Sequence, residues 1–261
     1  TDANVLNYGA FLAQNEPNHE AVIHENSSWS CAHGVERWQS NCGCHTGGEA
    51  HWNQEWRAPL RQGLDWLKTE LDRVYELEMS QITNEPWELR DKFIEVVYQA
   101  NKRHYRPFLE EHVSGIERNE VTHAIRLLEM QRNGMLMFTS CGWFFNDVSG
   151  IETIQILQYA NRAIQLAERE SELELEETFL SYLEKGRSNL PEFGSIRDIY
   201  KEHVTPKRMT LSKVGMHYAV HVLFAEKYKA FNQAQNYFQV RVSYLFSATS
   251  YFYTLAKIHK K

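Results

Sequence analysis

The central part of the chain, from about residue 56 to about residue 230, has apolar residues at steps of three and four positions. This spacing puts one apolar stripe along each helix and predicts a bundle of helices that bury their stripes against one another. The stripe of the first predicted helix comprises Leu60, Leu64, Leu67, Leu71 and Val74. The stripe of the second comprises Phe93, Val96, Val97, Ala100 and Phe108.

Polar and turn-forming residues mark the breaks between the predicted helices. Pro86, with Asn84 before it, separates the first helix from the second. A third helix is expected from about residue 118 to about residue 138. A fourth is expected to begin at Ser149, because Ser149 and Glu152 have the spacing of a capping box. A last helix is predicted over about residues 206–229.

The end of the chain follows a different period. Apolar and polar residues alternate from Phe238 to Phe246, and a second β-rich run follows a short turn, which predicts a hairpin. We therefore expect a mainly α protein with a loop-rich segment (1–55) packed on a helical bundle (56–230), and a short C-terminal β-hairpin (231–261). Because an isolated apolar hairpin is only marginally stable, we expect it to be the start of a truncated β domain.

Composition and charge narrow the class of protein. A chain of 261 residues with 43% hydrophobic content can bury a core of its own. The formal net charge of -6 argues against a nucleic-acid partner, because there is no basic surplus to neutralise phosphates. No apolar run approaches the roughly 20 residues of a membrane span, and no leader-like segment opens the chain. We expect a cytoplasmic protein with no membrane partner.

The four cysteines are the first candidate chemistry. Cys31, Cys42 and Cys44 lie close together in the sequence and Cys141 lies far downstream. Four thiolates can hold zinc or an iron–sulfur cluster, and the sequence does not choose between these cofactors. His33 or His45 can complete the ligand set if Cys141 does not.

Two other uses of these cysteines stay open. The spacing C-x10-C-x-C is not the paired C-x2-C of zinc ribbons, and free cysteine also packs as a small buried apolar residue. This atypical spacing favours packing over a metal site. A disulfide is the least favoured use, because a reducing compartment keeps thiols free.

Tryptophans and polar residues crowd the same part of the chain. Five tryptophans fall within 38 residues, and they are Trp29, Trp38, Trp52, Trp56 and Trp66. Glu36 and Arg37 are interleaved with them. Flat rings beside hydrogen-bonding groups suit the faces and hydroxyls of a sugar, although aromatic clusters in helical proteins also form cores.

Long stretches of the sequence resemble a known family. The run ENSSWSCAHGVERWQSNCGCHTGG, then WNQEWRAPLRQGLDWL, and later NGMLMFTSCGWFFNDVSGIETIQILQYANRAIQLA are similar to the region after the catalytic barrel in a subgroup of glycoside hydrolase family 57 proteins. The resemblance covers most of the chain, from about Leu6 to the start of the terminal β segment. It implies a helical region that packs on a (β/α) barrel, in cis or in trans, and lends loops to a glycan-binding cleft.

The resemblance also implies a set of substrate-binding residues. Stacking platforms would be Trp29, Trp38 and Trp143, and hydroxyl-bonding groups would be His33, Glu36, Arg37 and Asp147. The correspondence is looser at this turn, because Cys141 and Gly142 stand where relatives place an acid. Both the carbohydrate site and the four-thiolate site require the stretch around Trp29 and the turn around Cys141 to meet on one side of the bundle.

No catalytic residue can be assigned from this resemblance. Family 57 enzymes carry a glutamate nucleophile and an aspartate acid/base on the barrel, but too few residues precede Glu25 to form even two βα units. We therefore expect this chain to be part of a glycosidase or transglycosylase and not to hydrolyse a glycoside by itself.

Overall fold

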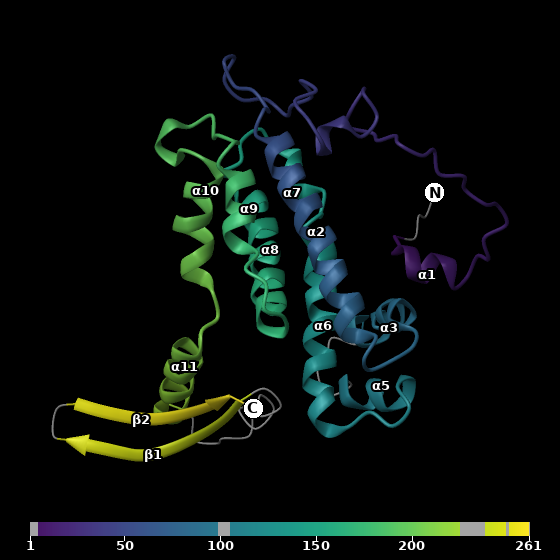
Figure 1. The fold of residues 1–261 in the computed structure, drawn as a ribbon. Helices are drawn as coiled ribbons and strands as arrows, with labels where there is room; N and C mark the ends of the chain where they lie inside the picture. Colours follow the sequence, from purple (N-terminus) through teal and green to yellow (C-terminus); the bar gives the residue numbers. More distant parts are fainter. Residues whose placement is uncertain (1–4, 99–104, 225–237, 249–250, 261) are drawn as a thin grey trace.

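The computed structural model describes residues 5–98, 105–224, 238–248 and 251–260. It confirms a mainly α fold (Figure 1). Four helices form the body, and they are α2 (Arg57–Met79), α6 (Arg118–Leu136), α8 (Ile151–Glu170) and α9 (Glu176–Leu183). Each runs antiparallel to the one before it, with α2 packed against the other three and α6 against α8.

The predicted stripe of the first helix forms the centre of this bundle. Leu60, Leu64, Leu67 and Leu71 are fully buried, and Val74 is 2% exposed. Because these residues recur once per turn, α2 presents one continuous apolar face to its neighbours. On α8, Ile156, Leu157, Ala160, Ala163 and Ile164 are buried in the same core.

Shorter elements close the two ends of the bundle. Around one end lie α3 (Pro86–Lys92), α4 (Ile94–Tyr98) and α5 (Tyr105–His112), and at the other lie the 3-10 turn η1 (Glu36–Trp38) and α7 (Cys141–Phe144) (Figure 1). The remaining elements are α1 (Tyr8–Leu12), η3 (Pro191–Phe193), α10 (Ile196–Ile199), the π-helical turn η4 (Tyr200–Val204), η5 (Thr205–Lys207) and α11 (Leu211–Phe224). No helix in the described part of the chain is long and apolar enough to span a membrane.

The predicted second helix is divided in the structure. Phe93 caps the end of α3, and α4 follows directly as a separate short helix. Phe93, Val96 and Phe108 are nevertheless buried, so the apolar pattern is used by three short helices in place of one. Ala100 lies outside the described residues.

The predicted capping box at the start of α8 is wrong. Gly150 is the N-cap residue, and it has no side chain to bond the first turn. The backbone N–H of Ser149 instead donates to Oδ1 of Asp147 at 2.9 Å. Asp147 is itself fixed by the neighbouring loop, and that tertiary bonding outweighs the local capping preference.

The C-terminal strands pair as the alternation predicts. Strands β1 (Phe238–Ala248) and β2 (Tyr251–Lys260) are antiparallel, with Phe238 opposite Lys260 and a register shift between Val242 and Tyr244. The predicted boundary between bundle and hairpin, at 230/231, falls outside the described residues. The division of the chain into three domains therefore stays a prediction.

The buried stripe of α2 gives a direct test of this core. Truncating Leu67→Ala removes fully buried methyl groups and leaves a cavity, so we expect the free energy of unfolding to fall by about 2–5 kcal/mol. Leu77→Ala on the same helix is the matched control, because Leu77 is 61% exposed and should change stability by no more than about 0.5 kcal/mol. Urea unfolding measures both, and equal effects would contradict the assigned core face.

Candidate metal centre

The N-terminal loop brings two pairs of ligand-type side chains together. Cys31 and His33 precede η1 in the sequence, and Cys42 and Cys44 follow it. Gly34 makes the first turn possible, because its φ is 76° and a Cβ there would clash with the carbonyl oxygen of Asn26. We call Cys31, His33, Cys42 and Cys44 the ligand cluster.

The ligand cluster has the dimensions of a single-ion site. One ligand atom from each residue lies within 4.8 Å of all the others. The Sγ atoms of Cys31 and Cys42 are 3.8 Å apart, and Sγ of Cys44 is 3.5 Å from Nδ1 of His33. A tetrahedral zinc ion with Zn–S near 2.3 Å and Zn–N near 2.05 Å requires separations of about 3.8 and 3.6 Å. The sulfur spacing is far too long for a disulfide, and all four cysteines of the chain are free.

The structure changes the predicted ligand set. Cys141 is exposed on α7 and does not belong to the ligand cluster, so the four-thiolate arrangement is not formed. His33, predicted as an alternate ligand, takes the fourth position. The other alternate, His45, also lies outside the cluster, and its Nδ1 accepts a hydrogen bond from the backbone of Gly47 at 3.1 Å.

Burial and hydrogen bonds act differently on the two thiols nearest each other. Burial would raise the pKa of Cys31, but hydrogen bonds from the backbone of Arg37 and of His33 outweigh it and bring the pKa to about 7. Burial raises the pKa of Cys42, and the neighbouring Cys31 raises it further. Backbone N–H groups directed at sulfur are suited to stabilising a thiolate, which is the form that binds metal.

Two buried arginines adjoin the ligand cluster. Arg57, the first residue of α2, is fully buried, and its Nη1 donates to the carbonyl oxygen of Cys44 at 3.0 Å. Burial lowers the pKa of Arg57 to about 10, while the cluster thiols favour its charged form. Arg37 is 3% exposed, with its guanidinium carbon 4.8 Å from the ring centroid of Phe144. The sequence patterns did not predict that Arg37 and Arg57 lie beside the thiols, because only the fold brings these side chains there.

The loop is attached to the turn around Cys141, as expected. Nε1 of Trp38 donates to the carbonyl oxygen of Ser140 at 3.0 Å, and the rings of Trp29 and Phe144 are 5.9 Å apart. The backbone N–H of Thr46 donates to Oδ1 of Asn146 at 2.8 Å. The prediction that these two segments meet on one side of the bundle is confirmed, although Cys141 itself does not join the thiols.

The predicted sugar platforms separate into exposed and buried rings. Trp29 is 91% exposed, and Trp38 is half-buried. Trp143 is 1% exposed, so its ring faces are covered by the core and cannot stack on a sugar. Trp143 therefore does not belong to the predicted carbohydrate site. Burying its large apolar ring in the core is more favourable than exposing the ring to solvent.

The predicted hydroxyl-bonding residues do not converge beside Trp29. Arg37 is buried, and Asp147 is 8% exposed. Glu36 accepts a hydrogen bond from Oγ of Ser40 at 2.7 Å, and His33 belongs to the ligand cluster. Arg37 and Asp147 are therefore structural in this arrangement, which corrects their assignment as sugar-binding groups.

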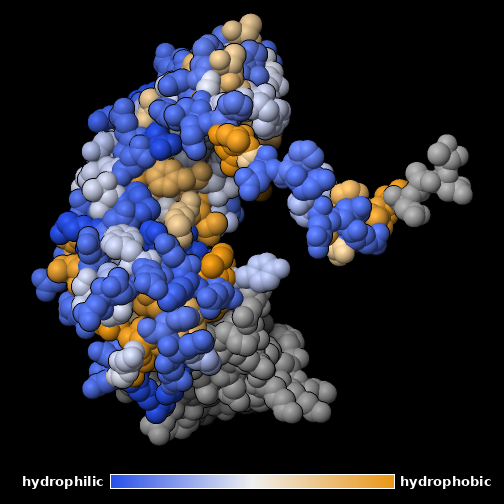
Figure 2. Space-filling model, turned by 90° about the vertical axis from the view of Figure 1, so that its right-hand side faces the viewer, coloured by the Kyte–Doolittle hydropathy of each residue, from blue (hydrophilic) through white to orange (hydrophobic). Residues whose placement is uncertain are grey.

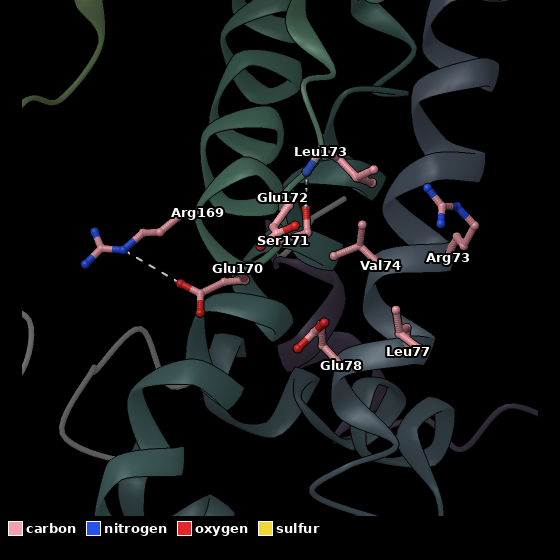
Figure 3. A pocket seen from close by; sticks show the side chains of 9 residues that line it. All are labelled: Arg73, Val74, Leu77, Glu78, Arg169, Glu170, Ser171, Glu172 and Leu173. Atoms are coloured by element: carbon pink, nitrogen blue, oxygen red, sulfur yellow. Dashed lines mark hydrogen bonds and ion pairs between the residues drawn. The ribbon is translucent and has the colours of Figure 1, made fainter.

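A separate pocket of about 440 Å³ lies lower in the bundle, between α2 and the end of α8 (Figure 3). Glu78 and Glu170 line it, and His123 lies between their carboxylates, with Nδ1 2.5 Å from Glu170 and Nε2 3.4 Å from Glu78. The hydrogen bond with Glu170 raises the pKa of His123. This group was missed in the sequence, because its members come from three helices and follow no common spacing.

Residues 52–250 match the family model described as a domain of unknown function, DUF3536. The chain belongs to this family. Comparison with curated proteins and with solved structures gave no match. The matched range begins at Trp52, so the ligand cluster precedes it, whereas Arg57 and Asp147 lie within it. The match therefore covers the helical bundle and continues to residue 250, and the cysteine loop lies before it in the chain.

Asp147 gives a test of the loop contacts in this DUF3536 domain. Burial opposes its ionisation, but hydrogen bonds from Ser149, Asn189 and Ser188 outweigh it and hold the pKa of Asp147 below its usual value. A lowered pKa stabilises the fold above the unfolded-state pKa of about 4, and this contribution is lost as the pH falls through the folded-state value.

We expect Asp147→Asn to cost about 1–3 kcal/mol of unfolding free energy at pH 7. The difference from wild type should shrink as the pH is lowered below about 4. Urea unfolding at a series of pH values measures this. A difference that stays constant down to acid pH would show that the charge of Asp147 contributes nothing.

Proposed function

We propose that the ligand cluster binds one metal ion, zinc in the first instance, and that this ion fixes the conformation of the N-terminal loop at the end of the helical bundle. The observation that carries the proposal is the set of ligand-atom distances, 3.8 Å between two sulfurs and 3.5 Å between sulfur and nitrogen. Both match one tetrahedral ion with Cys3His ligation. An iron–sulfur cluster spreads its ligands over several irons, so its ligand atoms lie further apart than those around one ion.

The loop has little else to hold its conformation. Between residues 5 and 55 only Cys31, Arg37 and Gln54 are buried. A segment with so few buried side chains gains little from the hydrophobic effect against the entropy of ordering its backbone. A metal with four protein ligands is closed to substrate and supplies folding free energy, which is the role of a structural site.

The proposal predicts metal content that depends on particular residues. Wild-type protein purified without chelator should contain about one zinc per chain, and Cys42→Ser and His33→Ala should lose most of it because each removes a ligand. Cys141→Ser is the matched control, since Cys141 is a free thiol outside the ligand cluster. Elemental analysis, together with thermal unfolding before and after chelation, measures the effect. Metal-free wild type, or equal loss in Cys141→Ser, would refute the site.

A second function is favoured by one further observation. Trp29 is 91% exposed at the same end of the bundle, with its ring beside Phe144. The resemblance to the region after the barrel in family 57 glycoside hydrolases makes an exposed ring there a candidate wall of a glycan cleft. We propose that the domain presents Trp29 to an oligosaccharide held by a (β/α) barrel, as part of a glycosidase or transglycosylase.

This second proposal has its own test in the protein that contains this chain together with its barrel. Trp29→Ala should weaken binding of an α-glucan oligosaccharide by about 1–3 kcal/mol, a value typical of stacking on one aromatic ring. Tyr98→Ala is the control, because Tyr98 is 87% exposed on α4, around the opposite end of the bundle (Figure 1). Isothermal titration calorimetry measures both variants. Unchanged affinity in Trp29→Ala would show that the ring does not line the glycan cleft.

A further inference from the structure

Arg57 is buried with only part of its hydrogen-bonding capacity satisfied, and its guanidinium carbon lies 5.6 Å from the ring centroid of Trp56. Its side chain is fully buried, and of its donor groups Nε and Nη2 have no hydrogen-bond partner among the described residues. Nη1 donates to the backbone carbonyl of Cys44 at 3.0 Å. The charges that favour the cationic form of Arg57 come from the cluster thiols and not from carboxylates.

Metal binding gives the ligand cluster a full and fixed negative charge. Three thiolates and one neutral imidazole around a divalent ion have a formal charge of -1, whereas the metal-free cluster carries only the charge of whichever thiols are ionised. A buried cation without a counter-charge is strongly destabilising, and a nearby anion offsets that cost. Arg57 therefore faces a full counter-charge in the metal-bound protein and a smaller one in the metal-free protein.

We infer that Arg57 is the counter-cation of the anionic metal–thiolate centre, and that its buried charge raises the affinity of the ligand cluster for a divalent metal. The inference rests on the proposed metal site and adds to it a positioning residue from the bundle. The counter-charge offsets part of the cost of burying Arg57 with unpartnered donors. The attraction between the charge of Arg57 and the metal–thiolate centre then holds the loop against α2.

Arg57 is a better choice for a test than Arg37. Arg37 lies inside the loop, and its guanidinium packs on Phe144, so changing it also disturbs how the loop packs. Arg57 is on α2, where the following turns are held by the leucine stripe. A substitution there changes the charge beside the cluster while the helix stays anchored.

Two variants separate charge from hydrogen bonding. Arg57→Gln keeps an N–H donor and removes the charge, and Arg57→Lys keeps the charge and removes the planar fork. We expect the zinc dissociation constant to rise by about 10- to 100-fold in Arg57→Gln, the usual range for a lost outer-shell partner, and by only a few-fold in Arg57→Lys. Competition with a chromophoric chelator on the full chain measures it. Arg73→Gln, on the exposed face of α2, should leave the constant unchanged.

A second measurement detects a role that is only structural. In chelator-treated protein, Arg57→Gln should lower the unfolding temperature less than it does in zinc-loaded protein, because the metal-free cluster presents less negative charge to the guanidinium. An equal fall in the unfolding temperature in both forms, or equal loss of affinity in the Gln and Lys variants, would overturn the inference. Wild-type protein that takes up no zinc would instead overturn the proposed metal site together with the inference.

Discussion

The packing of one helix face determines the rest of this structure. The leucine stripe of α2 is buried against α6, α8 and α9, and it fixes the rotation of α2 about its own axis. Arg57 begins this helix, so the same rotation decides that its side chain is directed beneath the cysteine loop. Packing of purely apolar residues thereby sets the position of a charged group that lies three residues before the stripe begins at Leu60.

The two ends of the bundle are stabilised by different kinds of interaction. Around one end, short helices bury aromatic rings such as Phe93 and Phe108. At the other, the loop lies over α7 through single polar bonds, including Trp38 to Ser140 and Thr46 to Asn146. The segment of residues 5–23 extends away from the bundle and exposes apolar residues such as Phe11, Val22 and Ile23, while the bundle surface is mostly hydrophilic in this view (Figure 2). A segment attached in this way benefits most from an added constraint such as a metal.

The metal and carbohydrate proposals are compatible because they use different residues. Trp143, Arg37 and Asp147 are buried and support the loop and the turns around it, whereas Trp29 remains exposed. His33 was a candidate for both roles, and the distance from Nδ1 to Sγ of Cys44 favours ligation. A metal that orders the loop would also hold Trp29 in one position, so the first proposal gives a physical basis for the second.

The sequence by itself determined the features that depend on near neighbours: the α2 stripe, the helix expected at 118–138 and found at Arg118–Leu136, and the gathering of three cysteines in one loop. Periodicity reports which face of a helix is apolar, because the residues that share a face are only three or four positions apart. Only the tertiary structure decided the break after Phe93, the N-cap at Gly150, and the choice of His33 over Cys141. The position of Arg57 beside the thiols was likewise invisible, because distances between residues far apart in the chain depend on how the helices pack and carry no local sequence signal.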